Sequence, residues 1–239
     1  MIDDDRHAKC QAEFCESENA RPRLGPSDAG PVLLPTGEQT MRVSREKALE
    51  NREQIIETAA RLLRQHGFDG IGVADIMKAA GLTHGGFYRN FASKDDLAVK
   101  ASERAIADST ALLKDGLAQQ PKDPFRELIE RYVSSAHCDD PGSGCILPAL
   151  AADAARSDDP ALRAVFITAI QDYLDQIAKL SSAPPRATGS RHPAAVLSEM
   201  VGAAILSRVI ANDPLADSLI AAVVADIAGP SPENKSAEA

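Results

Sequence analysis

The chain has 239 residues, of which 44% are hydrophobic but only 4% aromatic. This length can bury the core of one large or two modest domains, and an alanine- and leucine-rich composition without Trp favours helices over a β-sandwich or barrel. No run of 18 apolar residues is present, which excludes a membrane-spanning helix. The acidic start MIDDDRHAKC is unlike a secretory signal, so we expect a cytoplasmic protein that does not enter a membrane.

The net charge of −9 argues by itself against a nucleic-acid partner, but its distribution along the chain is uneven. Residues 41–100 hold 10 Lys/Arg against 8 Asp/Glu, while residues 1–40 carry a net −4 and residues 101–239 a net −7. An anionic partner is attracted by local charge, so it would bind within residues 41–100.

The first segment, residues 1–43, has no helical or strand period, and we predict a disordered N-terminal extension. Met41 could equally be the true start of the protein. From Ser44 the pattern becomes helical, because Ile55, Ala59 and Leu63 recur on one face with charged residues on the other. Gly67 is placed to end this helix.

A second, short helix is predicted in "GIGVADIMKAAGL", with Gly72 as a weak cap and Gly81 at its end. Thr83 is placed to cap a third helix, "HGGFYRNF". Ser93 and Asp96 form a capping-box pattern that begins a fourth helix, running to about residue 117.

Longer helical blocks follow residue 124, and we find no internal repeat and no convincing strand. A strongly amphipathic helix is predicted over 160–180, and two apolar helices over 194–210 and 215–228. The loop 181–193 separates the first of these helices from the other two, and residues 230–239 are predicted to be a disordered tail.

Two short helices joined by a glycine-containing turn are typical of a helix-turn-helix, whose second helix enters the major groove of DNA. Gly85 and Gly86 each cost a helix about 1 kcal/mol, and close approach of a partner to the backbone is a reason for them. His84 can reach a base edge, Tyr88 and Arg89 can reach phosphates, and Lys94 lies in the first turn of the next helix. We expect Phe87 and Phe91 to anchor the segment in the core.

The stretch "NREQIIETAARLLRQHGFDGIGVADIMKAAGLTHGGFYRNFASKDDL" resembles the DNA-binding domain of the TetR family of transcriptional repressors. The likeness covers roughly residues 44–100, and Ile71, Gly72 and Asn90 depart from the usual pattern. It implies an all-helical homodimer that binds a palindromic operator and is released by a small effector held in the C-terminal domain. By position it implies DNA contacts from the following residues: Arg45, Arg52, Thr83, His84, Gly85, Tyr88 and Lys94, to which we add Gly86, Arg89 and Asn90.

The expected architecture is therefore all-α. A small N-terminal helix-turn-helix domain (44–100), made of three helices, is joined by the fourth helix to a larger effector-binding and dimerisation domain (101–229). The last two helices are apolar enough to be either internal core or a dimer interface, and the resemblance favours the interface. Candidate effector-pocket residues are the aromatic or polar side chains on apolar helices, although the sequence alone favours ordinary packing in the core or at its rim for each of them: Tyr132, His137, Phe166 and Tyr173.

Cys10, Cys15, Cys138 and Cys145 do not form a C-x-x-C pair, and a cytosolic protein would keep them reduced. Cys145 opens a helix, a position that lowers a thiol pKa, so a redox-sensing thiol is one hypothesis. A zinc site of His137, Cys138 and Cys145 lacks a fourth ligand, and a buried inert thiol is the third option. A Cys145-dependent helical enzyme is the alternative function, but nothing orients His137 as its base. We therefore expect no enzyme activity, no cofactor and no metal.

Overall fold

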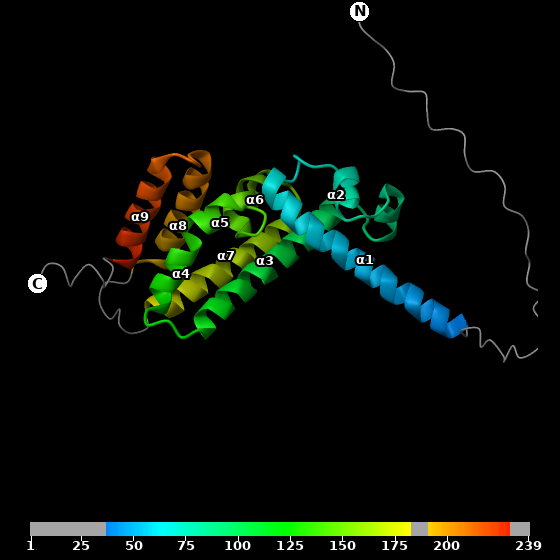
Figure 1. Cartoon of the computed structure of the whole chain (residues 1–239), viewed down its shortest axis with the longest axis horizontal. Coiled ribbons are helices and arrows are strands. Elements are labelled where there is room, and N and C mark those ends of the chain that lie inside the picture. Colours follow the sequence, from blue (N-terminus) through cyan, green and yellow to red (C-terminus); the bar gives the residue numbers. More distant parts are fainter. Residues whose placement is uncertain (1–36, 183–190, 230–239) are drawn as a thin grey trace, which may run out of the picture. The chain divides into compact units, whose positions relative to one another are not determined.

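A computed structural model describes residues 37–182 and 191–229 of the chain (Figure 1). The described residues form helices without a single strand, as predicted, and none of these helices is both long and apolar enough to cross a membrane. The N-terminal elements are α1 (Gly37–His66), α2 (Val73–Ala79), the 3₁₀ helix η1 (His84–Arg89) and α3 (Lys94–Ala118). The others are α4 (Pro124–Tyr132), α5 (Ser135–Asp139), α6 (Ile146–Arg156), α7 (Pro160–Ser181), α8 (Pro193–Val209) and α9 (Pro214–Ala228).

Helix α1 begins earlier than the sequence predicts. Residues 37–43 are helical, so the prediction of disorder across 1–43 is wrong for this part, while residues 1–36 and 230–239 lie outside the described residues. The early start escaped the sequence pattern because the amphipathic period marks only the part of a helix that buries an apolar face. That part is where Ile55, Ala59 and Leu63 are buried.

Two left-handed glycines shape the helix-turn-helix. Gly67, with φ of 79°, ends α1, and Gly81, with φ of 69°, reverses the chain after α2. The amide of Leu82 then donates to the carbonyl of Met77 at 2.9 Å, which fixes the turn. The next helix, η1, therefore starts directly beside the end of α2.

Thr83 occupies the N-cap position of η1, but its hydroxyl makes no capping hydrogen bond, so the predicted cap is wrong. The reason is the tighter 3₁₀ geometry of η1, in which the amide of Gly86 already donates to the carbonyl of Thr83 at 2.9 Å. The Ser93 cap of α3 is present. Its hydroxyl accepts from the amide of Asp96 at 3.1 Å, while the Asp96 carboxylate accepts from the amide of Ala92.

The C-terminal helices share a start signal. An Asp-Pro pair begins α4, α7 and α9, with the carboxylate accepting from the second or third helical amide and the proline at the first position. Helix α7 packs against α3 and α8, and α8 packs against α9. The buried side chains from Ile55 to Ile227 form one connected hydrophobic core, and α3 continues across the predicted domain boundary at residue 100.

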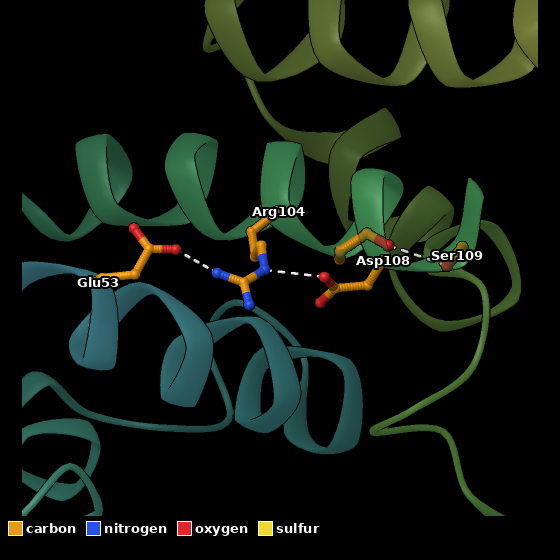
Figure 2. Close-up of polar contacts among 5 residues, drawn as sticks. Glu53, Arg104, Asp108 and Ser109 are labelled. Carbon is orange, nitrogen blue, oxygen red and sulfur yellow. Dashed lines mark hydrogen bonds and ion pairs between the residues drawn. The ribbon is translucent and has the colours of Figure 1, made fainter. Parts of the chain in front are cut away.

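Helices α1 and α3 are also joined by charge. Figure 2 shows the guanidinium of Arg104 between the carboxylates of Glu53 on α1 and Asp108 on α3. The hydrogen bond to Asp108, at 2.8 Å, is the main reason that the pKa of Arg104 is raised. The ion pair is largely open to solvent, so its orienting effect on the two helices matters more than its energy.

Candidate nucleic-acid interface and ligand cavity

The 3₁₀ helix η1 is anchored on one side and exposed on the other. Phe87 is 1% exposed and Phe91 is 3% exposed, and their rings pack with centroids 5.6 Å apart. Tyr88, between them in sequence, is 68% exposed, and its ring stands edge-on to those of Phe87 and His84. An exposed tyrosine offers both an apolar ring and a hydroxyl to a partner, so this side of η1 is suited to contact another molecule.

Thr83, His84, Gly85 and Arg89 are exposed on the same segment, as a contact surface requires. The two glycines are not demanded by the fold. An added Cβ at Gly85 would meet nothing within 4 Å, and one at Gly86 would make only ordinary contacts, the nearest 3.6 Å from Met77. Neither glycine has a positive φ. A space that the protein itself leaves open favours the interpretation that a partner approaches this backbone.

Other predicted contact residues have internal roles. Asn90 donates from its side-chain amide to the carbonyl of Gly86 at 2.8 Å, which holds η1 together. The guanidinium of Arg52 lies 5.1 Å from the centre of the Phe91 ring, a cation–π contact that seats α1 on η1. Arg45 is exposed on α1. Lys94 is the half-buried first residue of α3, and it lines a small pocket together with Asp69 and Asp95.

A cavity of about 580 Å³ lies between α3, α4, α5, α7 and the loop that precedes α6. Three of the four predicted pocket residues, Tyr132, His137 and Tyr173, line it, together with Cys145. Phe166 does not line it; this side chain is 5% exposed and belongs to the core. The aromatic walls touch, with the Tyr132 ring centroid 4.8 Å from that of His137 and 5.9 Å from that of Tyr173.

Both ring nitrogens of His137 are occupied. Nε2 accepts from the amide of Cys145 at 2.7 Å, so the proton must be on Nδ1, which donates to the carbonyl of Tyr132 at 2.7 Å. Burial, and after it the charge of Arg208, lowers the pKa of His137 below its usual value. His137 is therefore neutral, and its two hydrogen bonds join the end of α4 to the start of α6.

Cys145 is the N-cap of α6, and its sulfur accepts from the amide of Leu147 at 3.4 Å. The thiol is nevertheless buried, and burial raises its pKa, which outweighs the helix N-terminus. Burial likewise raises the pKa of Cys138. Among the described residues, no group of His, Cys, Asp or Glu is arranged to hold a metal ion, and the zinc hypothesis has no structural support.

The sequence did not point to the loop 140–145, which touches both the cavity and α1. Asp140, Ser143 and Gly144 line the cavity, while Gly142 is buried against α1, where an added Cβ would lie 2.7 Å from Nε2 of Gln65. Arg64 of α1 is only 7% exposed, and burial lowers its pKa against the opposing charges of Asp108 and, less strongly, Asp140. Only the folded chain brings these segments together, so no spacing in the sequence could have revealed the contact.

An apolar surface remains uncovered on the C-terminal helices. Leu206 is 53% exposed and Val209 is 78% exposed on α8, and Leu215 is 57% exposed on α9. On α8, an added Cβ at Gly202 would meet nothing within 4 Å. Monomeric proteins seldom leave several large apolar side chains exposed side by side, so this surface fits the predicted interface.

Residues 55–101 match the family model "Bacterial regulatory proteins, tetR family". The chain is 34% identical over 92 residues to the HTH-type transcriptional regulator AcrR of Shigella flexneri, an alignment that spans 38% of this chain and 43% of that protein. It is 32% identical over 83 residues to the HTH-type transcriptional repressor NemR of Escherichia coli, spanning 35% and 41%. The chain thus spans less than half the length of these curated relatives.

Solved structures extend the likeness. A TetR transcriptional regulator from Chloroflexus aurantiacus matches with a TM-score of 0.63 and 26% identity, over 77% of this chain and 96% of that one. AibR in complex with isovaleryl coenzyme A and operator DNA matches with a TM-score of 0.54 and 14% identity, over 76% and 100%. At that identity the second likeness concerns the fold alone.

Proposed function

We propose that the chain is a DNA-binding transcriptional repressor of the TetR family, released from a palindromic operator by a small effector. The observation that carries this proposal is the surface of η1. Phe87 and Phe91 fix the segment in the core, while Thr83, His84 and Tyr88 face outward. Short helices fixed in this manner present their N-terminal residues to base edges in the major groove.

The proposed DNA contacts divide into two kinds. His84 reads base edges, and the absence of side chains at exposed Gly85 and half-buried Gly86 lets the segment approach the duplex closely. Tyr88, Arg89, Lys94, Arg45 and Thr83 bind phosphates, which gives affinity without sequence preference. Arg52 and Asn90 support η1 from behind through Phe91 and Gly86, so we assign them a positioning role.

A palindromic operator requires two copies of η1. We propose that the copies are held by a homodimer built on α8 and α9, in which Leu206, Val209 and Leu215 of each copy are covered by the other. The open space at Gly202 permits close approach of the two α8 helices. The two η1 segments then have to lie about 34 Å apart on one side of the duplex.

Release follows from a shift between two dimer states. We place the effector in the cavity of about 580 Å³, and two elements connect this cavity to the DNA-binding region. Helix α3 lines it through Ser109 and Leu113 and begins at Lys94, and the loop 140–145 reaches α1 through Gly142. An effector that fits only one arrangement of these elements changes the spacing of the two η1 segments.

The test is selection of bound DNA from a random pool by the full-length protein at a fixed salt concentration of about 0.15 M. We expect an inverted repeat. His84→Ala should change which sequences are selected, and Lys94→Ala should weaken binding to all of them and lower the salt slope by about one. Lys114→Ala, on the exposed C-terminal part of the same helix, is the matched control. If His84→Ala leaves the selected sequences unchanged and Lys94→Ala leaves the affinity and the salt slope unchanged, η1 is not the interface.

The enzyme and redox alternatives receive no support. Both need a reactive thiolate at Cys145, whereas burial raises its pKa, and His137 has no ring nitrogen available to act as a base. The relatives are named as transcriptional regulators. We therefore assign no catalytic residue in this chain.

A further inference from the structure

A second, smaller cavity of about 320 Å³ lies between α3 and α7. Helix α3 contributes Ile106, Thr110 and Leu113 to its wall, and α7 contributes Ala169 and Tyr173. Leu113 and Tyr173 also line the larger cavity of about 580 Å³, and they are the two residues that both linings share. The two cavities are therefore neighbours, and the side chains of Leu113 and Tyr173 lie at their common boundary.

The register of α3 accounts for this boundary. Ile106, Thr110 and Leu113 recur at intervals of four and three residues, which places them on one stripe of the helix, facing the smaller cavity. Ser109 and Leu112 lie on the adjacent stripe and line the larger cavity together with Leu113. Leu113 is thus the position of α3 at which the two cavities meet.

Leu113 and Tyr173 form a partition that a ligand can displace. Both side chains are half-buried, and Leu113 carries no polar group that could fix it. The hydroxyl of Tyr173 lies beside the thiol of Cys145, a weak acceptor. The ring of Tyr173 meets that of Tyr132 edge-on, with the centroids 5.9 Å apart. Each of these contacts is weak compared with the burial of several CH₂ groups of a ligand.

The charged side chains of both linings lie at the rims or are paired. In the smaller cavity two exposed lysines are balanced by two exposed aspartates: Lys114, Lys179, Asp172 and Asp175. In the larger cavity the charged residues are exposed or form an ion pair with a neighbouring side chain: Glu127, Glu130, Arg131 and Asp140. Burying a charge without a partner is costly, so the interior favours the uncharged part of a ligand.

We propose that the two cavities form one extended binding site for an elongated molecule, whose uncharged alkyl chain passes between Leu113 and Tyr173 into the smaller cavity. This proposal names the ligand class of the effector site and rests on the proposed function for its regulatory meaning. Ile106, Thr110 and Ala169 then surround the far end of the chain. A chain that ends before Leu113 and Tyr173 does not reach the smaller cavity, so these two residues divide short ligands from long ones.

The test compares two probes that differ only in chain length, hexan-1-ol and dodecan-1-ol. Their binding to the full-length protein without DNA is measured by equilibrium dialysis, with gas chromatography to quantify each alcohol. Burial of the additional CH₂ groups should make dodecanol bind at least about a hundredfold more tightly than hexanol. Absence of dodecanol binding, or equal affinity of the two probes, would overturn the proposal.

Bulky substitutions in the smaller cavity locate the end of the chain. Thr110→Trp, on α3, fills space that belongs to the smaller cavity alone, so it should weaken dodecanol at least about tenfold and leave hexanol nearly unchanged. Gln176→Trp, on the α7 side of the same cavity, should have the same effect and provides the result if Thr110→Trp does not fold. The matched control is Thr168→Trp, at an exposed position of α7 outside both linings, which should change neither affinity.

Full dodecanol affinity in the folded Thr110→Trp or Gln176→Trp variant would confine the ligand to the larger cavity and refute the extended site. An equal loss for both probes would refute it as well, because a short chain should not depend on the smaller cavity. Release of operator DNA is scored separately by fluorescence anisotropy. Dodecanol binding without release would contradict the repressor mechanism and not the extended site.

Discussion

The carboxylate of Asp153 on α6 accepts a hydrogen bond at 3.1 Å from the amide of Phe68, the second residue after α1. The same oxygen would lie 2.8 Å from a Cβ at Gly67. One side chain of the C-terminal helices thus satisfies a backbone amide just past the end of α1, which would otherwise need water. The contact ties the end of α1, next to the proposed DNA-binding region, to α6.

Replacing this acceptor should destabilise the protein. Asp153→Ala should lower the free energy of unfolding by about 1 kcal/mol, because the half-buried amide of Phe68 loses its partner. Asp153→Asn keeps an acceptor oxygen and should lose less than half of that. Urea unfolding followed by circular dichroism measures both. If the two variants are equally stable, the hydrogen bond to Phe68 does not contribute.

Gly85→Ala separates folding from DNA binding. Because a Cβ at this position meets nothing within 4 Å, the variant should be as stable as the parent or slightly more stable, since Ala favours helix over Gly. Its operator affinity should fall at least about tenfold, because the added methyl group keeps the backbone from the duplex. Thermal unfolding and fluorescence anisotropy with the selected operator provide the two readouts. Full operator affinity in Gly85→Ala would show that DNA does not approach this backbone.

The buried imidazole of His137 should make stability depend on pH. Its pKa is lowered in the folded state by burial, so the unfolded chain takes up the proton first as pH falls. The stabilisation is complete above the unfolded value of about 6.5 and is lost as pH falls through the lowered folded value. His137→Gln, measured by urea unfolding at about pH 7 and about pH 5, should show a weaker decline than the parent. An equally steep decline would assign the effect to other groups.

Cys145 should be unreactive while the protein is folded. Burial raises its pKa and blocks access, so the thiolate needed for alkylation is scarce at neutral pH. We expect iodoacetamide to modify Cys145 at least about a hundredfold more slowly in the native protein than in urea, as followed by peptide mass spectrometry. Rapid native modification would revive the sensing hypothesis.

Val209 provides the test of the dimer. Its side chain is 78% exposed on α8, and Val209→Asp would bury a charge in the proposed interface, which is strongly unfavourable. Sedimentation velocity should show a dimer for the parent and a monomer for the variant. Leu49→Asp, at a leucine that is 63% exposed on α1, is the control and should leave the assembly unchanged. A dimeric Val209→Asp variant would place the interface elsewhere.

The local features of the fold could be predicted from the sequence. The 3.6-residue period located α1 through Ile55, Ala59 and Leu63, and the turn glycine Gly81 and the cap Ser93 behaved as their chemistry requires. Phe87 and Phe91 are buried as expected. The Thr83 cap was wrong because the sequence does not distinguish a 3₁₀ turn, which consumes the amide of Gly86, from an α-helix.

The cavity was predicted less well, because it depends on which helices pack together. Tyr132, His137 and Tyr173 come from different helices and meet only in the folded chain. Phe166 also lies on an apolar helix, but it is part of the core and does not line the cavity. Cys145 shows the same limit. The position of Cys145 at a helix N-terminus could be predicted from the sequence, but its burial, which raises its pKa, could not.

The connected core from Ile55 to Ile227 implies that α1, α3 and the C-terminal helices unfold in one cooperative transition. Stabilisation by a ligand in the cavity would then be shared by amides far from it. Hydrogen exchange at Leu63 or Leu97, both buried in the core and outside the cavity lining, should slow when the cavity is filled.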